Sequence, residues 1–520
     1  MYKIFLLSTF ILLISIVGGY SQTDSDMADT LITEKEYIST ELKGTVLDIN
    51  TQIALPYTNI YVLHKNIGAI SNEKGDFLIN IDRLESTDTL RFQYIGYKTK
   101  FITIVELRTT EVVYLEEEIF NLSETIIFGN ELNAEAIVKK VLKNKESNYK
   151  KSNAKKQVFM RRRYVSDIED IKLTYKKSSF DELDRDLLKV LEEKVPRYST
   201  SYTDFLGDLY FSSNEDDSIT LKTDPIRTVS LKEKDVTELE QIETIFENIF
   251  NDTKEEEYWK IKSGILSQKI DIENDDVKND SVTEESKKDS IKENQRLTKY
   301  NTSAIKYAFK YSLLDNKDNW EFLHSTGKYK YTLVGGTRVN AEDVYIIDFT
   351  PKSGGEFIGR MYISMSTYAL IRADYDYAPD KTGTDFQMFG VGYTENQFTG
   401  SIYFEKVDST YKLKYFSKKA GSFATFDRNI ALLKKRKRFL FDKKLKEIKI
   451  GIEMGLNSEQ SVEVLILDEE EITHQQFIDF EQEKYMEIIY VDQFDDNLWK
   501  GFSIIEPTKQ MREYKKQVVE

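Results

Sequence analysis

Aromatic and aliphatic side chains occupy every second position in long runs through the last third of this 520-residue sequence. One run contains Tyr329, Tyr331 and Leu333, and similar runs follow between short turns that contain Gly or Pro. Since neighbouring side chains of a strand point to opposite faces of a sheet, this period predicts strands with one buried face. Successive runs predict hairpins, so we expect residues 299–520 to form an antiparallel β-meander with a C-terminal segment, curled into a half-barrel.

Composition narrows the class of protein further. The chain has 32 Tyr and 30 Phe but 6 Pro, a balance that favours strands, and 40% of its residues are hydrophobic, enough for a buried core. The sequence has no Cys, which excludes disulfide scaffolds and metal sites built from thiolates. The formal net charge of −16 argues against nucleic acid as a partner, because binding to phosphates requires a basic surface.

The first residues predict export. Residues 1–21 have the organisation of a signal peptide: Lys3 precedes an apolar stretch over residues 4–17, and Gly19 and Ser21 supply the small residues of a cleavage site. Residues 22–39 are mostly polar and are expected to form a flexible leader. No later segment has 18 uninterrupted apolar residues, so we expect no integral membrane span after removal of the signal.

Residues 40–117 contain short, evenly spaced strand patterns. Gly75 ends one turn, and Phe77, Ile79 and Ile81 alternate after it. Strands this short and this regularly spaced predict a small antiparallel sandwich.

Four motifs in this segment, in the same order, resemble the carboxypeptidase-regulatory-like domain of exported proteins of Gram-negative bacteria. The resemblance implies a transthyretin-like seven-strand β-sandwich and an accessory role without peptidase activity. Tyr57 stands where a Gly is usual and Thr58 where a small residue is usual, so the local turn geometry is expected to differ. The motifs are Lys43-Gly44-Thr45-Val46, Ala54-Leu55-Pro56-Tyr57-Thr58-Asn59-Ile60, Ser71-Asn72-Glu73-Lys74-Gly75-Asp76-Phe77 and Tyr94-Ile95-Gly96-Tyr97-Lys98.

The remainder has two weaker resemblances. Residues 343–351, 357–363, 368–371 and 499–507 are similar to a family of uncharacterised exported proteins in which the regulatory-like domain precedes a β-rich region. The rhythm of the hairpins is similar to that of periplasmic lipoprotein carriers, whose half-barrel holds acyl chains. Together these features predict a mainly β fold with α-helices: an N-terminal sandwich, a helical middle and a C-terminal curled antiparallel sheet.

The middle of the chain, residues 131–270, is expected to be a mixed α/β region. Apolar residues at helical spacing predict helices over residues 133–147, 180–194 and 236–250. A strand is predicted over residues 156–165; its run Arg161-Arg162-Arg163 is interpreted as a solvated strand edge, with an anionic contact as the alternative. Residues 271–298 are polar and largely charged, and we expect a disordered insertion there. Further along, Gly335-Gly336 predicts a turn.

No pattern of catalytic or ligand-binding residues stands out. His64, His324 and His474 lie in unrelated segments, and none belongs to a zinc-binding spacing. There is no G-x-S-x-G sequence of a hydrolase nucleophile, and the 89 acidic residues are too many to single out a carboxylate pair. We therefore assign no catalytic, cofactor-binding or metal-binding residue and expect no cofactor.

The sharpest charge feature is a basic run on this acidic chain. It predicts a contact with an anionic partner, either lipid headgroups or an acidic protein, against the alternative of a solvated face. Its residues are Lys434, Lys435, Arg436, Lys437 and Arg438.

The function that these features favour is a non-catalytic binding or scaffold protein of the cell envelope, in one version holding a hydrophobic or lipid ligand in the C-terminal sheet. Its expected place is the periplasm or the periplasmic face of the outer membrane, with an envelope protein or lipid as partner. The alternative is a hydrolase of envelope polymers that uses a carboxylate pair. A sheet whose concave face is already filled by its own side chains would count against a bound ligand.

Overall fold

The computed structural model of the protein describes residues 41–514, apart from 66–67, 82–83, 121–132, 151, 214–218, 233–255, 265, 271–298, 340–341, 439–440, 484, 501 and 503. The predicted signal peptide, the leader, the helix over 236–250 and the insertion over 271–298 lie outside the described residues.

The N-terminal domain is the seven-strand sandwich that the sequence predicts. Its side chains alternate between the two sheets' inner and outer faces, and Val46, Ile60, Phe77 and Phe92 are fully buried between the sheets. One sheet has the order β4 (Asp76–Asn80), β1 (Glu41–Asp48), β7 (Val112–Leu115), and the other has the order β3 (Gly68–Ile70), β2 (Asn59–Val62), β5 (Thr89–Gln93), β6 (Lys100–Thr103). Thr103 caps the short helix α2 (Ile104–Leu107), which follows β6.

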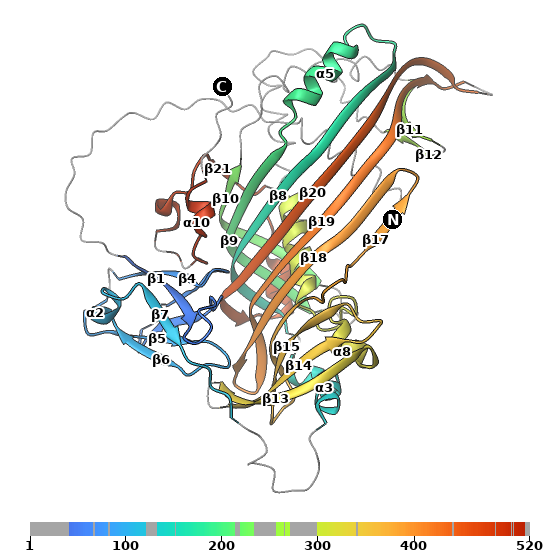
Figure 1. Cartoon of the computed structure of the whole chain (residues 1–520). Coiled ribbons are helices and arrows are strands. Elements are labelled where there is room, and N and C mark those ends of the chain that lie inside the picture. The colour runs from blue at the N-terminus through green and yellow to red at the C-terminus, as the bar shows by residue number, and fades with distance from the viewer. Residues whose placement is uncertain are drawn as a thin grey trace, which may run out of the picture.

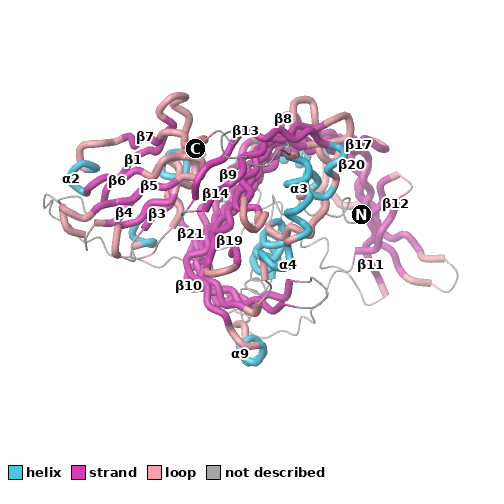
Figure 2. Tube along the Cα trace, turned by 90° about the horizontal axis from the view of Figure 1, so that it is seen from below, coloured by secondary structure: helices cyan, strands magenta, loops and turns pink. Residues whose placement is uncertain are grey.

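All the other described strands, β8 to β21, form one 14-stranded sheet, which is strongly curved and not closed (Figures 1 and 2). Consecutive hairpins build its first part, so the predicted meander is confirmed. The order is β13 (Tyr329–Val339), β14 (Glu342–Pro351), β15 (Phe357–Ser364), β16 (Leu370–Tyr377), β18 (Val391–Val407), β19 (Thr410–Arg436), β20 (Lys443–Glu471), β8 (Ala154–Ser178), β9 (Tyr198–Ser213), β10 (Ile219–Lys232) and β21 (Ile489–Val491). Two branches leave this order: β17 (Asp385–Met388) pairs with β18, and β11 (Glu257–Ser263) pairs with β19 and with β12 (Leu266–Ile270).

The sheet joins segments that the sequence assigned to separate regions. Strands β8, β9 and β10 come from residues 131–270, yet β8 pairs with β20 along almost its whole length. The prediction that Arg161, Arg162 and Arg163 lie at a solvated edge is wrong, because β8 runs between β20 and β9 in the interior of the sheet. The pairing partner of β8 is about 300 residues away, so no local pattern reports it.

Helices occupy the concave side of this sheet, as Figure 2 shows for α3 (Ala134–Lys143) and α4 (Lys145–Asn148). These two replace the single helix expected over 133–147, and Asn133 caps the first of them. A helix over residues 299–311 and α8 (Glu321–His324) lie in the same layer. On another part of the sheet, α5 (Arg185–Lys194) packs against β8 and starts later than predicted. Short helical segments complete the fold: η2 (Thr326–Lys328), α9 (His474–Asp479), η3 (Asp496–Trp499) and α10 (Lys509–Arg512).

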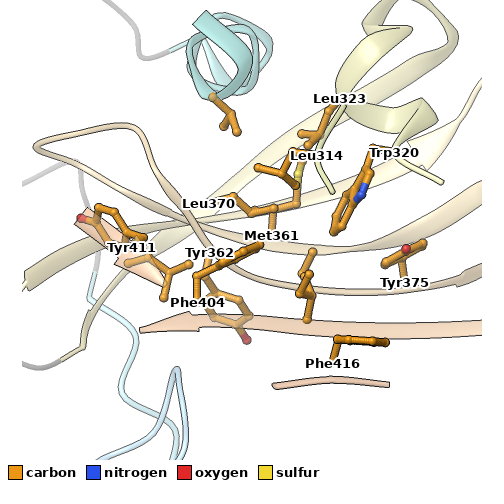
Figure 3. Close-up of a cluster of buried hydrophobic side chains, with 14 of the residues drawn as sticks. Leu314, Trp320, Leu323, Met361, Tyr362, Leu370, Tyr375, Phe404, Tyr411 and Phe416 are labelled. Atoms are coloured by element: carbon orange, nitrogen blue, oxygen red, sulfur yellow. The ribbon is translucent and has the colours of Figure 1, made fainter. Parts of the chain in front are cut away.

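The largest hydrophobic cluster lies between these helices and the sheet. In Figure 3, Leu314, Trp320 and Leu323 point from the helical side toward Met361 and Leu370 of the sheet. All five side chains are buried. The helices therefore fill most of the concave face with their own side chains.

The long strands have two parts. We call residues 154–165, 410–421 and 459–471 of β8, β19 and β20 the base, and residues 166–178, 422–436 and 443–458 the extension; these parts pair with one another in register. In Figure 1 the base lies beside the sandwich, and the extension runs up and away from it.

The sandwich packs on the outer face of the base through Tyr57. This residue has a φ of 62°, in the left-handed region that favours Gly, and its ring stacks on Tyr415 of β19 at 4.1 Å between centroids. A left-handed conformation costs a non-glycine residue about 1–2 kcal/mol. The aromatic contact offsets this cost, so the departure from the family pattern at Tyr57 is part of the domain contact.

A second contact involves Gly336, and the turn predicted at Gly335-Gly336 is wrong. Both glycines lie inside β13, next to a bulge after Leu333, and the backbones of Gly336 and Phe120 exchange hydrogen bonds of 2.8 and 3.0 Å. A Cβ on Gly336 would lie 2.5 Å from the ring of Phe120. The glycine thus permits the chain that leaves the sandwich to pair with the sheet.

Candidate binding site

The pocket of interest lies at the base, on the concave side of the sheet, where α4 and the end of the 299–311 helix meet β8, β9, β18, β19 and β20. Its volume is about 220 Å³. It opens between the helices that otherwise cover the concave face of the sheet, and we call this space the pocket.

Aromatic side chains form the inner walls of the pocket. Phe404 and Tyr149 lie 4.9 Å apart between ring centroids, and Phe211 and Phe309 lie 5.0 Å apart edge to face. Burial raises the pKa of Tyr149 well above its usual value, and its hydroxyl donates to the carbonyl oxygen of Leu370 at 2.7 Å. Tyr149 is therefore neutral and fixed, so this part of the wall is apolar.

Three charged groups lie together on one side of the pocket. Lys156 of β8 forms an ion pair with Glu469 of β20, and the ammonium of Lys412 lies 3.2 Å from the same carboxylate. Burial lowers the pKa of Lys156, although Glu469 opposes the change. Burial tends to raise the pKa of Glu469, but the two lysines hold it below its usual value. The group thus has two cations for one anion.

A second ion-paired group also lines the pocket. Lys145 forms an ion pair with Asp315 and lies 3.2 Å from the carboxylate of Glu146. Ser212 of β9 borders the pocket too, but Phe211 beside it faces the concave side, so the Ser212 side chain points to the outer face of the sheet.

The pocket does not have the electrostatics of a hydrolase site. Its three acids, Glu146, Asp315 and Glu469, each lie within ion-pair distance of a lysine, and the lowered pKa of Glu469 is opposite to the raised value that a general acid needs. The three histidines lie on different elements, and none lines the pocket. Within residues 41–514, gaps excepted, no cluster of three His, Asp or Glu side chains could hold a metal ion.

A buried polar group lies on the outer face of the base. Arg161 donates to both carboxylate oxygens of Asp204 at 2.9 and 2.7 Å and to the carbonyl oxygen of Ile505 at 2.9 Å. Glu463, the cross-strand neighbour of Arg161, is also buried, and burial raises its pKa to about 7 despite the nearby guanidinium. This group connects the sheet, the C-terminal segment and the contact with Tyr57.

The predicted basic run lies at the far end of the extension. Lys434 is buried and lies 3.2 Å from Glu257 of β11, and Arg436 lies 2.7 Å from the same carboxylate. Lys437 and Arg438 are exposed, and Lys435 is partly exposed. The run is thus divided between structural ion pairs and cations at the surface, which the sequence did not distinguish.

Neither the pocket nor the buried polar group was predicted. The residues Lys156, Lys412 and Glu469 come from segments more than 50 residues apart in each pair, and only strand pairing brings them together. Their local patterns are those of ordinary strand residues. Tyr57 did carry a signal, since it replaces a usual Gly.

Comparison with known proteins supports the assignment of the N-terminal domain. Residues 42–127 match the family model of the CarboxypepD_reg-like domain. This part of the chain is thus a CarboxypepD_reg-like domain, as its four motifs predict. A search of curated proteins gives no match.

Among solved structures, the chain is similar to several bacterial proteins at low identity. For a putative outer membrane lipoprotein-sorting protein domain from Vibrio parahaemolyticus, the identity is 8%, with 66% of this chain and 97% of that chain covered and a TM-score of 0.19. A LolA superfamily protein from Nitrosomonas europaea is 9% identical, with 67% of this chain and 98% of that chain covered and a TM-score of 0.16. MucB in complex with MucA is 8% identical, with 62% of this chain and 94% of that chain covered and a TM-score of 0.16. TM-scores this low do not establish a common fold.

Among the helices of the described residues, none is long and apolar enough to cross a membrane.

Proposed function

We propose that this protein is a non-catalytic binding protein of the cell envelope that takes an apolar tail of an anionic amphiphile into the pocket. The observation that carries the proposal is the combination of an aromatic wall with Lys156 and Lys412, which face the single carboxylate of Glu469. Such a site offers burial to a hydrocarbon chain and charge to its headgroup.

The charge at the pocket favours an anion over a cation or a neutral headgroup. Two ammonium groups share one carboxylate, so one positive charge lacks a local counterpart within the group. Charge-assisted hydrogen bonds are about twice as strong as neutral ones, so a carboxylate or phosphate oxygen fits best.

The size of the pocket limits the ligand. Pockets that enclose a drug-sized molecule have about 300–1,000 Å³, and this one has about 220 Å³ because the helices fill the rest of the sheet. We therefore infer that one hydrocarbon tail enters and that the headgroup stays at the lysines. A whole two-tailed lipid does not fit in this volume.

The expected place of action is the periplasm or the periplasmic face of the outer membrane. The signal-like residues 1–21 and the regulatory-like sandwich support this proposal. The hydrolase alternative receives no support from the pocket, since its acids Glu146, Asp315 and Glu469 each lie within ion-pair distance of a lysine.

The test is binding of decanoate, measured by native mass spectrometry and by calorimetry, with decyltrimethylammonium as the matched cation. We expect a 1:1 complex with decanoate and none with the ammonium compound. Lys412→Gln is expected to weaken binding at least tenfold, because a hydrogen bond between charged groups contributes about 1.5–3 kcal/mol. Equal binding of both compounds, or no binding of decanoate, would overturn the proposal.

A matched control lies two residues away on the same strand. Lys414 is the extra residue of a bulge in β19 and does not line the pocket. Lys414→Gln removes the same charge from the chain, so it is expected to leave the affinity for decanoate unchanged. Leu413→Trp, which adds bulk to the pocket wall, is expected to abolish binding while the fold remains.

A further inference from the structure

The end of the β19–β20 hairpin is the strongest remaining feature of the surface. We call the described residues 434–438 and 441–446 the tip. It lies at the end of the extension farthest from the sandwich (Figure 1). At about 3.3 Å per residue, the strand from Lys412 at the pocket to Lys434 spans roughly 70 Å, so the tip and the pocket are separate sites.

Cations are concentrated at the tip. The segment contains eight Lys and Arg residues and one acid, Asp442, on a chain whose net charge is −16. Three successive cross-strand pairs join like charges: Lys434 with Lys446, Lys435 with Lys444, and Arg436 with Lys443. Like charges directly opposite each other destabilise a sheet, so an anion at this place would relieve a repulsion built into the hairpin.

Structural ion pairs neutralise only part of this charge. Glu257 pairs with Lys434 and Arg436, and Glu447 lies 2.8 Å from the ammonium of Lys444. Among the described residues, no carboxylate lies within 4 Å of the charged nitrogens of the other cations. These are Lys435, Lys437, Arg438, Lys443 and Lys446, of which Lys446 instead lies over the ring of Phe180.

An exposed aromatic side chain lies among these cations. Phe441 is 87% exposed, the largest fraction of any large hydrophobic side chain among the described residues. The next residue, Asp442, accepts a hydrogen bond from the hydroxyl of Tyr258 at 2.5 Å. An exposed Phe loses the stabilisation that burial would give, so a local environment that buries it would be favoured.

We propose that the tip binds the surface of anionic lipid membranes, with Phe441 entering the headgroup layer and the flanking Lys and Arg side chains contacting lipid phosphates. Basic residues around an apolar side chain are the arrangement by which proteins bind such surfaces. Among the described residues, this narrow hairpin end offers one exposed aromatic, Phe441, which is far less than the roughly 800 Å² that a stable protein contact buries on each partner. Membrane binding by the tip does not depend on ligand binding in the pocket.

The experiment is flotation of the full-length protein, purified after export, with vesicles of phosphatidylcholine alone or with 30% phosphatidylglycerol. We expect partitioning only onto the anionic vesicles, with a marked decrease at high salt. Phe441→Ser is expected to reduce partitioning roughly tenfold. The triple variant Lys435→Gln, Lys437→Gln, Arg438→Gln is expected to reduce it roughly 100-fold.

The matched control for Phe441 is another exposed aromatic at a hairpin end. Phe389, which is 70% exposed, lies in the turn between β17 and β18 and is not part of the basic run over residues 434–438. Phe389→Ser should leave partitioning unchanged. Binding to both vesicle types alike, no binding of the unmodified protein, or equal effects of the two Phe substitutions would overturn the proposal. Phe441→Ser changes an exposed side chain, so it tests the tip even if the triple variant does not fold.

Discussion

The base and the extension are built from the same three long strands, yet different elements cover them. At the base, Met160 of β8 faces the helices while its neighbour Phe159 faces the sandwich and the C-terminal segment. Both faces are therefore buried. In the extension the described clusters are smaller and include Trp259 of β11 and Phe426 of β19. The same continuous strands can thus have both faces buried in the base, where the pocket lies, and be more exposed in the extension, where charged side chains reach the surface.

This comparison predicts a large difference between two ion pairs on β8. Arg161 and Asp204 are almost completely buried at the base, whereas Lys172 and Glu453 of the extension are 68% and 54% exposed. Arg161→Met should lower the free energy of unfolding by about 3–5 kcal/mol, because Asp204 is left buried without its partner. Lys172→Met should change it by less than about 1 kcal/mol. Chemical denaturation measures both, and equal losses would contradict the distinction between base and extension.

Acidic residues of β20 should differ in the same way with pH. The pKa of Glu463 is about 7 in the folded protein, against about 4.3 for an ordinary Glu. Its protonated form stabilises the fold, so this contribution is complete below about pH 4 and is lost as the pH rises through 7.

Glu463→Gln cannot ionise, so it should stabilise the protein at pH 8 by an amount on the order of 2–3 kcal/mol and leave it unchanged at pH 4. Thermal unfolding at both pH values measures the difference. Glu453→Gln, in the exposed pair of the extension, is the control for loss of a carboxylate from the same strand. A stabilisation by Glu463→Gln that is the same at both pH values would argue against burial as the cause.

The domain contact gives a smaller effect. Gly336→Ala places a Cβ 2.5 Å from the ring of Phe120, so we expect a loss of about 1–2 kcal/mol and faster proteolysis between the sandwich and the sheet. A Cβ on Gly327 would meet nothing within 4 Å, so Gly327→Ala should have almost no effect. If the two substitutions lower the stability equally, the close approach of Phe120 is not the reason why position 336 needs Gly.

Local patterns in the sequence predicted the local parts of the fold. Alternation at Tyr329, Tyr331 and Leu333 predicted the meander, and the four motifs predicted the CarboxypepD_reg-like sandwich. The pairing of β8 with β20 was not predictable, because both strands have the same alternation and nothing local selects a partner 300 residues away. The pocket depends on that pairing, so its residues could not be identified either.

Gly335-Gly336 shows a different reason for failure. A pair of glycines between alternating segments usually indicates a turn. Here the glycines instead leave room for Phe120, a contact between domains that a local rule does not include. The basic run over 434–438 was found from sequence, but its division between Glu257 and the surface depends on β11.

The central claim, that the pocket at the base takes the tail of an anionic amphiphile, is tested most directly by photo-crosslinking. A decanoate analogue with a diazirine at the tail end is added, irradiated, and mapped by peptide mass spectrometry. The account predicts labelling of Phe309, Phe404 or Leu413, with loss of the label when unmodified decanoate is in excess. Labelling confined to the tip or spread over the exposed surface, unaffected by that competitor, would contradict it.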